Sequence, residues 1–238
     1  MPDKRTHRGP HPADVKLFAA AVISDLRSAI ADFSLLLTKG YAAKSSLKLV
    51  GDRFSLTERQ RTAIMRSACS DQQLVSRRSR EVKIAELGGK PIVIDGYNVL
   101  ITIEAAMSSA CVFKGRDGCF RDLASIHGTY RKVTETIPAV QLIGQFLKEH
   151  NAGDCLWLLD SPVSNSGRLK TLIGGLAREN KWEWEIELLP SPDAKLIRTD
   201  LTAASSDSLV LDCCKRWVNL ARAIIEEKVP KARIVDLS

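Results

Sequence analysis

The sequence lacks the features that mark several large classes of protein. It contains no run of about 18 uncharged apolar residues, so no membrane span is expected. The first twelve residues, MPDKRTHRGPHP, are charged and include no apolar stretch of the kind that a secretory signal peptide requires. The six cysteines show no C-x-x-C spacing, which disfavours a zinc site. Together with the missing signal, they predict reduced thiols in a cytoplasmic protein.

Motifs of common enzyme classes are also missing. Neither G-x-x-x-x-G-K-[ST] nor G-x-G-x-x-G occurs, which disfavours a nucleotide-driven motor and a Rossmann dehydrogenase. The absence of G-x-S-x-G argues against an α/β-hydrolase. The function therefore has to be sought in other residues.

Positive charge is concentrated in the first third of the 238 residues. The chain has a net charge of +7, and residues 1–90 hold 17 Lys and Arg against 9 Asp and Glu, which leaves 18 against 19 in the remainder. A basic segment joined to an acid-bearing domain suits binding to a phosphate-rich polymer. The alternative is a solvated, basic helical surface without a partner.

The first third is predicted to be a basic helical domain, residues 1–82. Apolar residues recur at helical spacing over 13–39, and a second helix is expected over 42–50. Thr57 is typical of an N-cap for a third helix, and Ser70 or Asp71 of an N-cap for a fourth.

From Gly88–Gly89 onward the pattern changes to short apolar runs that alternate with helical stretches. This alternation predicts a three-layer α/β/α domain over 88–238, with a mainly parallel sheet covered by helices on both faces. A hairpin that turns at Asp117–Gly118 is expected between Val112 and Phe120. Helices are expected over 137–150 and 166–180, and buried strands over 91–100 (PIVIDGYNVL), 155–160, 183–190 and 201–207.

Aspartates stand where the predicted strands end. Asp95, Asp160 and Asp207 close three apolar runs, and Asp193 opens a helix after the fourth. Because the carboxyl ends of parallel strands meet at one edge, we expect these four side chains to converge there. Carboxylates without Cys or His point to Mg²⁺ or Mn²⁺, and such ions serve phosphodiester hydrolysis. The alternative is that each Asp only caps the helix that follows it.

The order of these motifs resembles the PIN-like nucleases, especially their NYN branch. The resemblance spans roughly residues 88–215 and rests on Ile94–Asn98, Leu159–Asp160, Pro192–Ala194 and Ser205–Asp207. Two positions depart from the family pattern, since Pro192 precedes the helix aspartate and Ser205 stands where Thr is common. The 183–190 run alternates Glu with apolar residues, which predicts an edge or half-exposed strand.

The resemblance implies a role for each matching residue. It implies a divalent-cation site of Asp95, Asp193 and Asp207, with Asp160 as a fourth catalytic or substrate-side acid and with supporting roles for Asn98 and Ser206. The basic third has a resemblance of its own, through Leu35–Tyr41 and Leu56–Arg61, to domain of unknown function 434.

Further polar residues are candidates for binding substrate. Arg116, Asp117, Arg121 and Asp122 crowd the predicted hairpin, where they would grip a phosphate backbone or complete the metal site. Alternatively, they form local ion pairs on a solvated loop. Arg168, near the start of a predicted helix, is a candidate for contacting a phosphate.

The sequence thus predicts a Mg²⁺- or Mn²⁺-dependent nuclease that favours RNA and has no membrane partner. The alternative is a non-catalytic PIN-like module that binds RNA or protein, because a fold does not confer an activity. The sequence leaves open RNA against DNA, endonuclease against exonuclease, and the oligomeric state.

Overall fold

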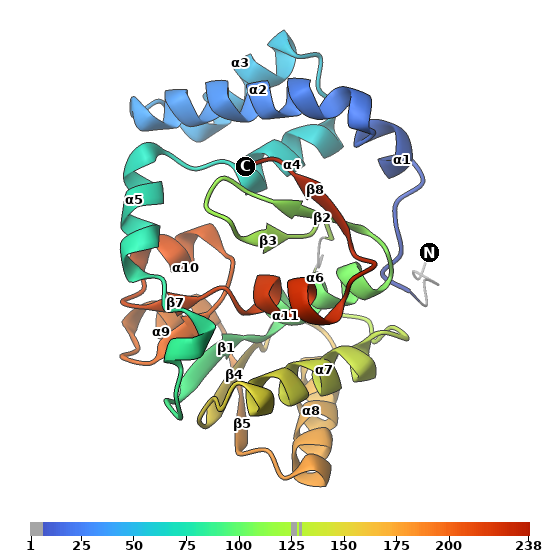
Figure 1. Ribbon diagram of the computed structural model, residues 1–238, viewed down its shortest axis with the longest axis vertical. Coiled ribbons are helices and arrows are strands. Elements are labelled where there is room, and N and C mark those ends of the chain that lie inside the picture. The colour runs from blue at the N-terminus through green and yellow to red at the C-terminus, as the bar shows by residue number, and fades with distance from the viewer. Residues whose placement is uncertain (1–6, 125–127, 129) are drawn as a thin grey trace.

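A computed structural model describes residues 7–124, 128 and 130–238 and shows a helical layer above two sheets (Figure 1). The helical layer is formed by α1 (Asp14–Leu17), α2 (Ala20–Thr38), α3 (Ala43–Arg53), α4 (Glu58–Ser67) and α5 (Asp71–Arg80). The single helix predicted over 13–39 is therefore two. Thr57 and Ser70 both cap their helices through capping boxes, as the sequence predicted.

The larger sheet is parallel throughout and has five strands in the order β5-β4-β1-β6-β7. Its strands are β1 (Ile92–Asp95), β4 (Cys155–Asp160), β5 (Trp184–Leu189), β6 (Thr202–Ala204) and β7 (Trp217–Val218). The predicted α/β class with a parallel sheet is confirmed. So is the position of β5 at an edge, where most of its residues are partly exposed.

Alternating strand residues face two separate hydrophobic clusters, which makes the larger sheet the middle of three layers. Ile92 and Ile94 join the cluster formed with α6 (Gly96–Met107), α7 (Thr136–Glu149), α8 (Ser166–Asn180) and α11 (Leu220–Lys228). Val93 faces the opposite cluster, with α9 (Pro192–Arg198) and α10 (Ser208–Cys213). Coverage of both faces explains why the strands read as continuous apolar runs.

The strand predicted over 91–100 is wrong beyond Asp95, because α6 begins at Gly96. Nearly every residue from Gly96 to Ala106 is buried, so this helix carries no polar face and reads like a buried strand. Gly96 itself is required by close packing, since a Cβ there would lie 2.8 Å from the Leu158 carbonyl oxygen. The immediate turn leaves Asp95 at the tip of its strand.

A smaller sheet joins the α/β part to the helical layer. The predicted hairpin is present as β2 (Cys111–Lys114) and β3 (Phe120–Arg121), and β8 (Arg233–Asp236) adds to β2 in parallel. Phe113 and Val235 of this sheet share one hydrophobic cluster with Phe33 of α2 and Ile64 of α4. The two halves of the chain thus share a core. A short 3-10 helix, Ile84–Glu86, lies between α5 and β1.

Candidate functional site

Asp95 lies at the carboxyl end of the central strand, and its side chain is only 8% exposed. Ser205, which follows β6, donates its hydroxyl to the Asp95 carboxylate at 2.7 Å. The Ser205 Oγ also accepts from the Asp207 backbone N–H at 3.0 Å. Ser205 therefore fixes both the Asp95 carboxylate and the loop that carries Asp207.

Asn98 and Ser206 form a second link between the same two loops. The Asn98 Oδ1 accepts from the Ser206 backbone N–H at 2.8 Å and from its hydroxyl at 2.9 Å. Asn98 stands in the first turn of α6, so the bond ties the start of that helix to the end of β6. Both residues therefore hold the loop in place.

The other three aspartates sit at the same edge of the sheet. Asp160 is the last residue of β4, and Asp193 lies in the first turn of α9 after β5. Asp207 accepts hydrogen bonds from Leu209 N and Val210 N, so it is also the N-cap of α10. All three side chains are partly exposed. Helix capping and a place in the acidic site thus coexist in Asp207.

Three of these four carboxylates have a raised pKa. Burial raises the pKa of Asp95, the hydrogen bond from Ser205 opposes this rise, and the charges of Asp207, Asp193 and Asp160 add to it, so that the pKa is about 7. Burial and the charge of Asp193 raise the pKa of Asp160, and burial and the charge of Asp207 raise the pKa of Asp193. Every ion pair among the described residues uses other carboxylates. We refer to Asp95, Asp160, Asp193 and Asp207 as the acidic edge.

The acidic edge has the ligand type that suits a divalent cation but does not supply a complete coordination shell. Its donors are carboxylate oxygens, the ligands that Mg²⁺ and Mn²⁺ prefer. Within the described part of the chain, however, no three His, Cys, Asp or Glu side chains gather closely enough to hold a metal ion together. Mg²⁺ sites commonly use one or two carboxylates, with water and substrate phosphates completing the shell. The acidic edge suits that open kind of site.

A cavity of about 460 Å³ opens beside the acidic edge, between the ends of β1 and β6. Connections leave these two neighbouring strands in opposite directions, and such a switch point is where ligands bind in parallel sheets. The cavity is lined by Tyr97, Asn98, Thr102, Ser206 and Asp207, and by Arg66 of α4. Helical layer and sheet thus both contribute to it, which the sequence did not reveal.

Tyr97 is the least satisfied side chain of this cavity. Its ring is buried, and its hydroxyl has no hydrogen-bond partner in the described structure. Burial and the charge of Asp160 raise its pKa to about 12, so the hydroxyl keeps its proton at neutral pH. A buried, protonated hydroxyl beside carboxylates is a donor available to a ligand oxygen.

Most of the hairpin residues are engaged inside the protein. Asp117 and Arg121 are 7% exposed, and Arg121 donates to Asp117 at 2.9 and 2.7 Å. Arg77 of α5 donates to Asp117 at 2.6 Å and to Asp212 at 2.7 Å. Arg121 also donates to the Ser206 carbonyl at 2.7 Å, so this buried network supports the loop that carries Asp207. The local ion pair of the alternative interpretation is thus present between Asp117 and Arg121, but it is buried and not on a solvated loop.

The remaining substrate-binding candidates divide into engaged and free groups. Arg116 donates to Asp71 at 2.5 Å and to the Cys69 carbonyl at 2.9 Å. Asp122 accepts from the Thr102 hydroxyl at 2.9 Å. Arg168 is exposed and has no hydrogen-bond or ion-pair partner among the described residues.

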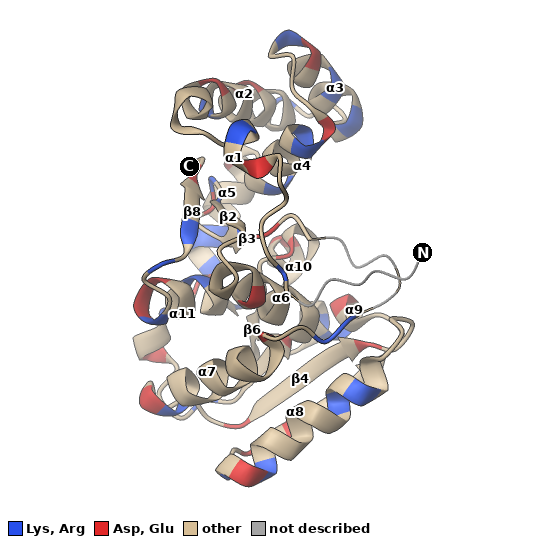
Figure 2. Ribbon diagram, turned by 90° about the vertical axis from the view of Figure 1, so that its right-hand side faces the viewer, with Lys and Arg blue, Asp and Glu red and all other residues tan. Residues whose placement is uncertain are grey.

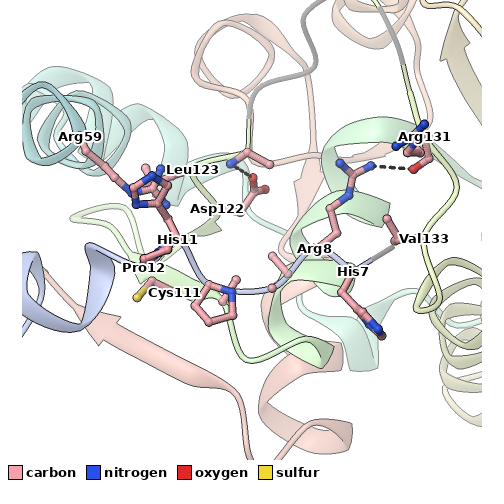
Figure 3. A pocket seen from close by; sticks show the side chains of 15 residues that line it. His7, Arg8, His11, Pro12, Arg59, Cys111, Asp122, Leu123, Arg131 and Val133 are labelled. Atoms are coloured by element: carbon pink, nitrogen blue, oxygen red, sulfur yellow. Dashed lines mark hydrogen bonds between the residues drawn. The ribbon is translucent and has the colours of Figure 1, made fainter. Parts of the chain in front are cut away.

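A second cavity, of about 380 Å³, lies where the N-terminal segment crosses α6 (Figure 3). Although Arg8 lines it, its guanidinium is paired at 2.8 Å with Glu104, a fully buried carboxylate that also accepts from Tyr130 and Thr136. Arg59 is likewise paired with Asp14. Sequence reasoning missed Glu104, although a Glu inside the apolar stretch NVLITIEAAM was a visible signal.

The fold and the acidic edge define an α/β protein with a parallel sheet and a helical N-terminal layer. The chain belongs to the family described as Domain of unknown function (DUF5616), which matches residues 84–223. Residues 25–80 match Protein of unknown function (DUF434), which confirms that resemblance. Neither description carries an activity, so the PIN-like resemblance stays a proposal.

One relative shares most of the chain. An uncharacterized protein of Methanocaldococcus jannaschii is 29% identical over 180 residues, which cover 76% of this chain and 86% of that protein. No solved structure matches. Within the described residues, no helix is both long and apolar enough to cross a bilayer.

The raised pKa of Asp95 predicts a pH-dependent cost to stability. The folded protein binds this proton more tightly than the unfolded chain, so the free energy of unfolding falls as pH rises from about 4 to about 7. Asp95→Asn removes this cost and retains an oxygen that can accept from Ser205. We expect the variant to melt above the wild type at about pH 8 and level with it below about pH 4. Melting curves followed by circular dichroism test this, and equal curves at pH 8 would refute it.

Proposed function

We propose that the protein is a Mg²⁺- or Mn²⁺-dependent nuclease that hydrolyses phosphodiester bonds, with RNA as the preferred substrate. The observation that carries the proposal is the acidic edge, where burial and neighbouring carboxylates raise the pKa of Asp95, Asp160 and Asp193 and none of the four carboxylates has a cationic partner among the described residues. Such a cluster costs folding free energy, and uncompensated perturbed groups concentrate at functional sites. The motif order of the PIN-like nucleases supports the same function.

Each residue of the proposed site would have its own role. A divalent cation bound there would activate water and stabilise charge on the phosphate oxygens. Asp95, Asp193 and Asp207 would hold the cation, and Asp160 would act from the substrate side. Ser205 holds the Asp95 carboxylate, and Asn98 holds the loop of Asp207. The Tyr97 hydroxyl, which has no described partner, would donate to a phosphate oxygen.

The charge distribution favours a nucleic-acid strand as the substrate. The excess of Lys and Arg lies in residues 1–90, and Figure 2 shows Lys and Arg positions, in blue, along α3 and α4. Arg66 of α4 reaches the cavity beside the acidic edge. Contacts between Lys or Arg and phosphate groups hold the nucleic-acid backbone without distinguishing its bases. Since all six cysteines are free thiols, the proposal places the protein in the cytoplasm.

A cleavage assay tests the proposal against the non-catalytic module. Purified protein is incubated with end-labelled single-stranded RNA in Mn²⁺, in EDTA, and in EDTA followed by excess Mn²⁺. A parallel series uses DNA of the same sequence. We expect cleavage with Mn²⁺, none in EDTA, recovery on addition of Mn²⁺, and slower cleavage of DNA. RNA that is bound but never cut would favour the module.

Affinity for nucleic acid is predicted to fall steeply with salt. A single strand that contacts the protein through about four phosphates should bind about 50-fold more weakly at about 200 mM than at about 50 mM salt. Fluorescence anisotropy with a labelled RNA, in EDTA to prevent cleavage, measures this slope. Affinity that does not change with salt would argue against a backbone-binding role for the basic residues.

A further inference from the structure

A third hollow, of about 440 Å³, lies between the segment Tyr130–Lys132 and the start of α8. Three cations line it, Arg131, Lys132 and Arg168, and among the described residues no acidic one does. All three are exposed. We refer to this group as the basic hollow.

The cations of the basic hollow are uncompensated, unlike the arginines of the N-terminal cavity and of the hairpin network. Arg8, Arg59, Arg77 and Arg116 each form an ion pair with a carboxylate. The three side chains of the basic hollow form none among the described residues. Three like charges on one cavity repel one another, so an anion that enters it is favoured.

The frame of the basic hollow is held by hydrogen bonds between its two walls. Asn165, at the start of α8, donates its side-chain amide to the Tyr130 carbonyl at 2.9 Å. The Tyr130 backbone N–H donates to the Ser164 carbonyl at 3.1 Å. The Tyr130 ring is buried. Arg131 and Arg168 therefore project from segments that are fixed to each other.

The basic hollow lies beside the acidic edge. Helix α8 follows β4, whose last residue is Asp160, and Figure 2 shows a basic end of α8 near the head of the β4 arrow. The Tyr130 ring centroid is 5.3 Å from that of Tyr97, whose pKa is raised by burial and by the charge of Asp160. The cavity that contains Arg66 opens on the other side, between β1 and β6. Arg66 lies 4.0 Å from the Asp122 carboxylate and donates to the Asp122 and Ala124 carbonyls, so a partly engaged cation lies on that side and three cations without a described partner lie on the other.

We propose that the basic hollow binds a backbone phosphate of the substrate strand, next to the phosphate that is cut. The inference rests on the proposed function and deepens it. The acidic edge repels a polyanion, so flanking cations are needed to hold the strand across it. The planar guanidinium groups of Arg131 and Arg168 match phosphate oxygens in pairs. A strand that is held on both sides continues past the acids in both directions, which makes the enzyme an endonuclease.

Binding measured without metal tests the basic hollow independently of cleavage. The test variant replaces Arg131, Lys132 and Arg168 with Gln. The control variant makes the same change at Lys148, Arg178 and Lys231, which are also exposed and unpaired among the described residues. Both variants lose three positive charges, and Arg178 lies about 15 Å along α8 from Arg168.

We expect the test variant to bind a fluorescein-labelled single-stranded RNA about tenfold or more weakly in EDTA, and the control less than about threefold. The salt slope of the test variant should also fall by about 2. Equal weakening in the two variants would overturn the proposal, as would a wild type that does not bind this RNA.

A circular single-stranded RNA tests the consequence for cleavage. With Mn²⁺, the wild type is expected to open the circle, because the strand needs no end to cross the acidic edge. Cleavage of linear RNA alone would overturn the two-sided arrangement. Should the wild type cut neither RNA, the proposed nuclease function fails, and the EDTA binding comparison still decides whether the basic hollow binds phosphate.

Discussion

Asp95→Asn is expected to slow Mn²⁺-dependent RNA cleavage by about 100-fold or more while the protein stays folded. The substitution removes one negative charge from the acidic edge but keeps an oxygen that accepts from the Ser205 hydroxyl. A loss of activity would therefore report the missing charge and not a collapsed loop. Initial rates on labelled RNA, at saturating Mn²⁺, measure the effect.

Asp200→Asn is the matched control for this experiment. The substitution is chemically the same but lies at an exposed residue. The only described ion pair of Asp200 is with Lys215 on the surface. Asp200 precedes β6, whereas the acidic edge follows the strands, so it lies at the opposite edge of the sheet. The rate of RNA cleavage by Asp200→Asn should stay within about twofold of the wild-type rate. Full activity in Asp95→Asn would remove Asp95 from the proposed mechanism.

Asp117→Asn is expected to lower the free energy of unfolding by about 3–5 kcal/mol at pH 7, because it leaves buried cations unpaired. Asp117 accepts from both Arg77 and Arg121, and all three side chains are almost fully buried. Burial alone would raise the pKa of Asp117, yet the charges and hydrogen bonds of Arg121 and Arg77 hold it well below its usual range.

The pH dependence of this effect follows from the lowered pKa. The unfolded chain takes up the Asp117 proton near pH 4 and the folded protein only at much lower pH, so the ion pairs stabilise the fold above that range. Their contribution is lost as pH falls, and the difference between wild type and variant should shrink below about pH 4. Urea unfolding at several pH values measures this difference, and the control Asp200→Asn is expected to unfold at nearly the same urea concentration as the wild type. A pH-independent difference would contradict the ion-pair explanation.

The same network ties stability to the site. Arg77 comes from α5 of the helical layer, Asp117 from the hairpin, and Arg121 reaches the Ser206 carbonyl next to Asp207. Loosening Asp117 should therefore disturb the acidic edge as well as the junction between the two parts of the chain.

The sequence predicted the elements whose signals are local. Capping at Thr57 and Ser70, the hairpin turn and the apolar run that became β4 all depend on residues near one another in the chain. It mistook the start of α6 for strand, because a helix buried on every side shows no helical periodicity. It also missed β8, whose pairing with β2 joins residues more than 100 positions apart.

The site, like the fold, has features that local sequence predicts and features that depend on distant segments. The four aspartates were predicted because strand ends and parallel pairing place them at one edge without further knowledge. The partners that decide which charges remain free come from distant segments, as when Arg77 pairs with Asp117 and Asp212. Arg116 and Arg168 look alike in the sequence, yet only Arg116 has a carboxylate partner among the described residues.

The most direct test of the acidic edge as a divalent-cation site is the anomalous scattering of Mn²⁺ in crystals of the protein soaked with the ion. We expect a peak at the carboxyl edge of the larger sheet, within about 2–2.6 Å of an Asp95 oxygen and of at least one oxygen from Asp160, Asp193 or Asp207. Crystals of Asp95→Asn should lose that peak or show it much weakened. No Mn²⁺ at this edge, with the four carboxylates paired to Lys or Arg instead, would contradict the account.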